Sequence, residues 1–354
     1  MKSILDFSKF TFSAEQIRDI NELVYEQVLH APDLDYLHTM FPGIVYDKEI
    51  GFVTSSGLVG MKGQGCDPTP QDWNIASRKV LWQPKPWEIF IDECASDLEN
   101  TAAVYSMKRG TAIDDLTDTD YMAIVVMVLT DAVRDFMYRL VWFNDTDSAN
   151  AGDQGGIITS GVNVDYFNII DGFFKQLGIA VTAHSELLVP IAANAKETKA
   201  GQMAAMDSEA AFELLKSMYY KAPIELRSSG NMRFLVTRSV ADAYQQYLIG
   251  KGIESTYKNL VEGIDALTFL GVPVVPVHIW DKMIQSFNDL GTTWYKPHRA
   301  LLIERENLAV GTPSQEAYGT MDIWYDKTSR KNYILLKDKL DAKLLDDRRL
   351  VYAQ

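Results

Sequence analysis

The stretch Phe269-Leu-Gly-Val-Pro-Val-Val-Pro-Val277 is an apolar extended run that one glycine and two prolines interrupt. Two shorter apolar runs, Arg233-Phe-Leu-Val-Thr237 and Ala300-Leu-Leu-Ile303, lie before and after it. Their length and apolar character are typical of buried strands. A helical pattern precedes them at Ser208 to Tyr220, and Ile179-Ala-Val181 reads as a further short strand after a helical Tyr166 to Leu177. This alternation predicts a mixed α/β unit.

A long helix is predicted upstream of this unit. Neither glycine nor proline occurs between Gly110 and Gly152, and apolar residues recur at helical spacing from Thr119 to Phe143. Four aspartates (Asp114, Asp115, Asp118 and Asp120) place negative charge near its start, where the helix dipole favours it. About 25 residues at 1.5 Å each give a rod of roughly 37 Å. Its apolar first half predicts that it lies under a sheet.

A projecting β-hairpin is predicted before the helix. The extended segments Ile44–Tyr46 and Ile50–Val53 precede a glycine- and proline-rich stretch from Ser55 to Trp73, and Val80–Trp82 and Trp87–Ile91 follow it. Three tryptophans, Trp73, Trp82 and Trp87, are associated with this hairpin. If exposed, they would suit burial against a neighbouring subunit. Packing inside their own domain is the equally weighted alternative.

The two ends of the chain carry weaker signals. Residues 1–10 read as an extended arm, and Ser13-Ala-Glu-Gln16 has the spacing of a capping box that opens a helix ending by Pro32. Near the other end, Met321–Tyr325 and Asn332–Leu336 flank a polar turn and predict a hairpin. The charged segment Lys337–Arg349 is expected to be a solvent-exposed strand or a subunit edge with alternating charges.

Composition limits the functional classes. The chain has 354 residues and a net charge of −14, which disfavours a grip on nucleic acid because phosphate binding needs clustered Lys and Arg. Two cysteines, Cys66 and Cys94, cannot form a disulfide framework and fit a reducing cytoplasm. The N-terminus has no signal-peptide core, and the ten apolar residues from Tyr121 to Thr130 are too few for a bilayer span, so no membrane partner is expected.

No motif indicates catalysis. Gly60-Met-Lys-Gly-Gln-Gly65 superficially resembles a phosphate-binding loop, but Cys66-Asp-Pro-Thr-Pro70 follows it and cannot open a helix promptly. The five histidines are scattered without metal-ligand spacing. The acidic residues of 92–99 are interpreted as a solvated face or an intersubunit salt-bridge surface. We therefore predict no catalytic, cofactor-binding or metal-binding residues, no cofactor and no enzymatic activity.

The order of these elements resembles the tailed-phage major capsid proteins of the Hong Kong 97 type. The segment Leu267-Thr-Phe-Leu-Gly-Val-Pro-Val274 looks like the family's "leucine-glycine-x-proline-valine" strand, and Arg299–Ile303 looks like the strand that follows it. The polar, glycine-containing break after the long helix, Trp142–Gly156, also fits. Gly60–Cys66 with Trp73 looks like the extended loop of capsid proteins from gut Bacteroidetes phages.

The resemblance implies an α+β fold of four parts. These are an N-terminal arm and helix (residues 1–43), an extended β-hairpin loop (44–95), a peripheral domain with a long spine helix (96–150 and 315–354) and an α/β axial domain (151–314). It implies self-assembly as pentamers and hexamers into an icosahedral phage head that encloses DNA without sequence-specific binding. A separate scaffolding protein and a portal are the implied partners. The location is the virion capsid, made in the cytoplasm of the bacterial host.

Four residues are predicted to make intersubunit contacts, namely Lys62, Trp73, Trp82 and Trp87. Lys62 also sits where some relatives carry a crosslinking lysine. Three alternatives remain: an encapsulin-like nanocompartment shell that binds a cargo peptide, a two-domain α/β enzyme with a site in an axial-domain cleft, and a tail-tube protein, against which the long helix argues.

Overall fold

The computed structural model describes residues 34–56, 62, 74–93, 120–153, 155–252, 259–261, 264–314 and 320–354. Its helices are α1 (Leu34–Leu37), α2 (Asp120–Phe143), α3 (Phe173–Ala183), α4 (Lys199–Ala205), α5 (Ser208–Lys221), α6 (Ile224–Arg227), α7 (Arg238–Gly250) and α8 (His278–Phe287). Its strands are β1 (Thr39–Pro42), β2 (Lys48–Ser56), β3 (Asn74–Trp82), β4 (Lys85–Glu93), β5 (Leu188–Val189), β6 (Met232–Val236), β7 (Asn259–Val261), β8 (Ile264–Phe269), β9 (Val272–Pro276), β10 (Ala300–Glu304), β11 (Leu308–Thr312), β12 (Thr320–Asp326), β13 (Lys331–Leu344) and β14 (Leu350–Ala353). The predicted arm and the predicted helix at 13–31 lie outside the described residues.

The three apolar runs quoted first form the centre of a seven-stranded mixed sheet, confirming the predicted α/β unit. Its strand order is β5-β14-β10-β6-β9-β8-β7. β10 is antiparallel to both of its neighbours, β6 and β14, whereas β6 and β9 are parallel. Both faces of the sheet are covered, which explains why its strands are continuously apolar.

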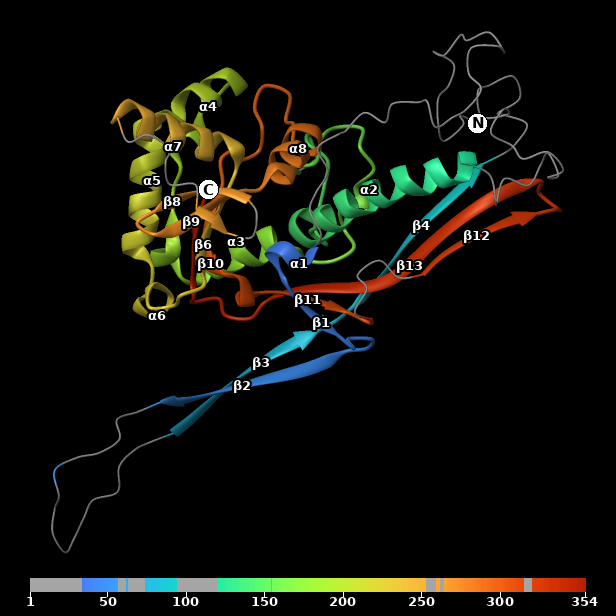
Figure 1. Ribbon diagram of the computed structural model, residues 1–354, viewed down its shortest axis with the longest axis horizontal. Coiled ribbons are helices and arrows are strands. Elements are labelled where there is room, and N and C mark those ends of the chain that lie inside the picture. The colour runs from blue at the N-terminus through green and yellow to red at the C-terminus, as the bar shows by residue number, and fades with distance from the viewer. Residues whose placement is uncertain are drawn as a thin grey trace, which may run out of the picture.

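Alternate residues of this sheet point into two separate cores. In β10, Leu301 and Ile303 face a core that contains α3 and α8, whereas Ala300 and Leu302 face a second core that contains α5 and α7. This follows from the two-residue period of a strand. The helices α5 and α7 therefore form an outer layer on one side of the sheet, visible at the left of Figure 1.

The run that was expected to be one extended segment folds as a hairpin. β8 ends at Phe269 and β9 begins at Val272, with Leu267 opposite Val274. The turn between them has positive φ at both central residues, 50° at Leu270 and 83° at Gly271. Two consecutive residues with positive φ are typical of the tight turns that join antiparallel strands. Gly271 therefore marks a chain reversal rather than an interruption of one strand.

A second sheet of five strands lies beside the first. It has the order β1-β11-β13-β12, and β4 pairs with β13 along its other edge. The predicted hairpin at the C-terminal end is confirmed as β12–β13. The expectation of a solvent-exposed strand at Lys337–Arg349 was wrong, because β13 pairs with β4 as far as Leu340 and then with β11 as far as Leu344, whereas the alternative of a subunit edge stays a prediction. Leu340, Asp341 and Ala342 of this segment are buried.

The long helix α2 confirms the prediction for Thr119 to Phe143, and it packs against the five-stranded sheet. Val133 and Met137 share a core with Ile334 and Leu336 of β13. The helix α3 (Phe173–Ala183) corrects a second expectation. Ile179–Val181, predicted to be extended, lies within this helix. The buried residues Phe173, Leu177, Ala180 and Val181 of α3 follow the spacing of one helix face.

The predicted β-hairpin is confirmed in its middle part as β2–β3, paired antiparallel from Lys48 opposite Trp82 to Ser56 opposite Asn74. Its predicted base was wrong, because Ile44–Tyr46 is not a strand and Trp87–Ile91 lies in β4, which pairs with β13 instead. The β2–β3 hairpin extends away from both sheets (Figure 1).

Within the described part of the chain no helix is long and apolar enough to cross a membrane.

Candidate functional site

The base of the β2–β3 hairpin is fixed by Trp82. Its side chain is fully buried, and its ring lies 5.7 Å from that of Phe41 in β1. The ring rests on Gly311 of β11, where a Cβ atom would come within 2.7 Å of it. The next residue, Gln83, donates its backbone N–H to the buried carboxylate of Asp341 at 2.7 Å. These contacts attach the hairpin firmly to the five-stranded sheet.

Trp87 of β4 is buried on the face of the sheet that α2 covers. It is 3% exposed, and its ring meets that of Phe136 in α2 at 5.3 Å. Trp82 and Trp87 therefore pack within their own chain, the alternative that the sequence left open. Their indole surfaces are not offered to a neighbour, because the chain's own core already covers them.

Lys62 is exposed, and Trp73 lies outside the described residues. Their assignment as intersubunit contacts stays a prediction. The structure does not bring Lys62 together with the two buried tryptophans into one site.

The opposite face of the same sheet carries a row of aromatic side chains, two exposed and one half-buried, that the sequence reasoning missed. We call Phe90 (β4), Tyr333 (β13) and Trp324 (β12) the aromatic row. The Phe90 and Tyr333 rings are stacked at 5.3 Å, and the Tyr333 and Trp324 rings are 5.4 Å apart. Phe90 is 57% exposed and Trp324 is 37% exposed. The signal was present, because Phe90 alternates with the inward-facing residues Trp87, Ile89 and Ile91.

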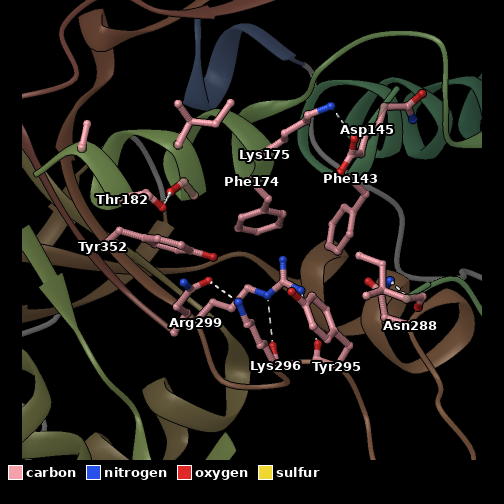
Figure 2. Close-up of a pocket in the computed structure, with 16 residues that line it drawn as sticks. Phe143, Asp145, Phe174, Lys175, Thr182, Asn288, Tyr295, Lys296, Arg299 and Tyr352 are labelled. Atoms are coloured by element: carbon pink, nitrogen blue, oxygen red, sulfur yellow. Dashed lines mark hydrogen bonds and ion pairs between the residues drawn. The ribbon is translucent and has the colours of Figure 1, made fainter. Parts of the chain in front are cut away.

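A cavity of about 660 Å³ lies between α3, the end of α2 and the loop before β10 (Figure 2). Its walls are largely aromatic, formed by Phe143, Phe174, Tyr295 and Tyr352. Three cationic residues also line it, Lys175, Lys296 and Arg299, whereas Asp145 is its one acidic residue. Sequence reasoning did not find this cavity, because its residues come from distant parts of the chain and form no motif.

Arg299 is the most deeply buried cation of the cavity, at 3% exposure. Its guanidinium stacks on the Phe174 ring at 4.1 Å, donates from Nε to the Lys296 carbonyl at 3.0 Å and from Nη2 to the Tyr295 carbonyl at 3.3 Å. Burial lowers the pKa of Arg299, while the nearby Tyr352 and Tyr295 hydroxyls favour its charged form. Burial also raises the pKa of Tyr352 to about 12, so this hydroxyl stays protonated.

Lys175 at the cavity wall is neutralised by acidic neighbours. Its Nζ lies 2.6 Å from Asp145, 2.7 Å from Asp147 and 2.9 Å from Asp171. Burial alone would lower the pKa of Lys175, but hydrogen bonds to these three carboxylates raise it above its usual value. The charge of Lys175 is therefore satisfied within the protein.

Ser239 and His298 form a hydroxyl–imidazole pair of the kind that some catalytic sites contain. Ser239 Oγ lies 2.7 Å from His298 Nδ1, and His298 Nε2 lies 3.0 Å from the Gln202 carbonyl. The carbonyl fixes the proton on Nε2, so the hydroxyl donates to Nδ1. His298 is fully buried and neither residue lines the cavity of Figure 2, which makes the pair a packing contact. Among the described residues no group of His, Cys, Asp and Glu side chains could hold a metal ion.

Comparison with known proteins gives structural but no sequence relatives. No protein-family model and no curated protein matches the chain. The capsid of Myoviridae phage XM1 matches with a TM-score of 0.55 at 8% identity, over 97% of this chain and 98% of that chain. A structure from Gordonia phage Cozz matches with a TM-score of 0.54 at 12% identity, over 97% and 91%. The capsid of the native GTA particle matches with a TM-score of 0.52 at 9% identity, over 94% and 92%.

These matches extend over nearly the whole of both chains, so they concern the complete arrangement of elements rather than one shared motif. The chain therefore has the fold of phage capsid proteins.

Proposed function

We propose that this protein is a major capsid protein of the Hong Kong 97 type, and that it assembles as pentamers and hexamers into the icosahedral shell of a phage head. One observation carries the proposal: the phage XM1 capsid shares the fold over 97% of this chain and 98% of its own. A fold alone does not fix a function. The surfaces described above supply the second line of argument, because they suit contacts between many copies.

The four-part division predicted from the sequence is proposed for the folded chain: an arm (1–43), an extended loop (44–95), a peripheral domain (96–150 and 315–354) and an axial domain (151–314). Two observations support such a division: α2 packs on the five-stranded sheet, and the outer core of the seven-stranded sheet lies within 189–353. β14 (Leu350–Ala353) crosses the proposed boundary, because it pairs with β10 in the seven-stranded sheet, and the core under α2 continues to α3 and α8. Pairing of β4 with β13 holds the end of the extended loop on the peripheral domain.

The β2–β3 hairpin and the aromatic row are proposed to meet between copies. The hairpin projects and carries apolar side chains in water, with Ile75 at 61% and Leu81 at 44% exposure. The aromatic row offers a flat apolar surface of the kind that protein interfaces bury. Lys62 and Trp73, which the sequence places in the same loop, are proposed as further contacts. Trp82 and Trp87 serve these contacts indirectly by holding the strands that present them.

The remaining partners follow from the same proposal. A scaffolding protein and a portal would direct closure of the shell, which would form in the cytoplasm of a bacterial host. The net charge of −14 suits a wall that encloses DNA without gripping it. The role is structural rather than catalytic.

Sedimentation velocity over a range of protein concentrations tests the proposal. We expect the chain to form discrete large species whose amount rises with concentration and with a co-expressed scaffolding protein. A species that stays monomeric at high concentration, with the scaffolding protein present, would contradict it. DNA-free particles that contain a co-purified enzyme would instead favour the nanocompartment.

A further inference from the structure

Three cations, Lys175, Lys296 and Arg299, line the cavity of Figure 2. Lys175 is balanced by three carboxylates, those of Asp145, Asp147 and Asp171. Two cations, Lys296 and Arg299, therefore remain without an acidic partner among the described residues. Lys296 Nζ instead contacts the Gln354 side-chain oxygen at 2.9 Å and lies 5.0 Å from the centre of the Tyr295 ring.

Arg299 is an unusual residue to leave without a counterion. A buried charge is costly unless it is paired, and its 3% exposure denies it most of its hydration. Two backbone carbonyls, the Tyr352 hydroxyl and the stacked Phe174 ring compensate in part. Figure 2 shows the guanidinium between Phe174 and Tyr295. An anion bound in the cavity would supply the counterion that Arg299 lacks.

We propose that this cavity binds a carboxylate carried on an apolar group, with Arg299 and Lys296 as its cationic partners. A guanidinium matches a carboxylate in shape and charge. The aromatic walls favour an organic anion over a fully hydrated inorganic one, because apolar surface would be buried beside the charge. The rim is also partly apolar, since Ile179 is 60% exposed there.

The same chemistry has two sources. One is an Asp or Glu side chain of a second copy of this chain, flanked by apolar residues. The other is a free organic acid. The site does not depend on the proposed self-assembly, but the first source does, so the experiment separates them.

Calorimetric titration of the full chain with benzoate tests the site, with benzamide as the uncharged probe of the same shape. We expect one benzoate to bind per chain. Benzamide should bind at least about tenfold more weakly, because a charge-assisted hydrogen bond is lost. Arg299→Lys and Lys296→Gln should each weaken benzoate binding about tenfold. Inorganic phosphate should bind more weakly than benzoate.

A pair of rim variants keeps the test independent of the buried arginine. Thr182 is exposed at the mouth of the cavity, so substitution there leaves the core intact. Thr182→Glu places a carboxylate beside the site and should suppress benzoate binding, whereas Thr182→Gln should not. Melting temperatures identify any variant that fails to fold. Benzoate that does not bind, or that binds the wild type and all four variants equally, would overturn the proposal.

The source is then decided by repeating the sedimentation experiment with benzoate present. If the acid comes from a second copy, saturating benzoate and Thr182→Glu will both reduce self-association. If it is a free organic acid, self-association will not change although benzoate binds. A chain that does not self-associate at all would count against the proposed function, while the titration would still test the cavity.

Discussion

Trp82 shows how one side chain positions a whole projecting element. Its ring fills the space over Gly311 and beside Phe41, at the point where β3 leaves the sheet. Trp82→Ala should lower the free energy of unfolding by about 3 to 5 kcal/mol, because it empties a large buried volume. Chemical denaturation measures this. The neighbouring Leu81→Ala is the matched control, since Leu81 is 44% exposed and its loss should cost less than about 1 kcal/mol.

Asp281 gives a residue-scale prediction in pH. Burial raises the pKa of this carboxyl from 3.8 to about 6. The hydrogen bond that the carboxylate accepts from the Arg238 backbone N–H, at 2.8 Å, lowers the pKa in part, and the nearby Asp242 charge adds to the rise. Between these two values the folded state binds more protons than the unfolded state, so this group makes stability fall as pH rises from about 4 to about 6.

Asp281→Asn removes this titration while keeping an oxygen for the Arg238 N–H. We expect the variant to be more stable than the wild type by about 1 to 2 kcal/mol at pH 7, discounted for partial exposure, and to lose that advantage at pH 4. Thermal melts at both pH values check it. An advantage of equal size at pH 4 and pH 7 would show that the carboxyl does not titrate in this range.

At the scale of elements, α2 depends on the sheet that it covers. Val133 is 2% exposed and shares a core with residues of β13, whereas its neighbour Ala132 is exposed. Val133→Asp should destabilise the fold by more than about 3 kcal/mol, because it buries an unpaired carboxylate. Ala132→Asp should change stability by less than about 1 kcal/mol. Urea denaturation followed by circular dichroism compares the two, and equal effects would contradict the packing described here.

The aromatic row makes a prediction about association rather than folding. Phe90→Ser should cost less than about 1 kcal/mol of stability, because Phe90 is 57% exposed. It should weaken self-association about tenfold or more if the row is buried between copies. Ile249→Ser is a matched control, because Ile249 is 62% exposed and lies on α7, which covers the other, seven-stranded sheet. Sedimentation velocity gives the protein concentration at which half of each variant is associated. If this concentration is the same for Phe90→Ser and Ile249→Ser, the row is excluded as an interface.

Local patterns allowed most elements to be predicted, and their limits have physical causes. The α2 helix and the β12–β13 hairpin were correct because periodicity and turn residues are local signals. Ile179–Val181 was wrong because β-branched residues suggested a strand, although their burial follows a helix face. The parallel pairing of β1 with β11 has no local signal, since the two strands come from opposite ends of the chain.

For the molecule as a whole, the order of elements was more informative than any motif. It indicated the phage capsid fold, which the structural matches bear out at 8 to 12% identity. The fate of the tryptophans could not be decided in the same way. A large apolar side chain gives the same sequence signal whether its own core or a neighbour covers it. The sequence therefore could not show that Trp82 and Trp87 are buried within the chain and that the exposed aromatic residues, Phe90 and Trp324, lie elsewhere.

Closed assembly is the property on which the proposal depends, because many weak contacts between copies become strong only when they act together. Negative-stain electron microscopy of the purified chain, expressed alone and with the proposed scaffolding protein, tests this most directly. We predict closed shells of uniform diameter, or rings of five and six copies that convert to shells when scaffold is present. Particles that remain single chains under both conditions would contradict the account.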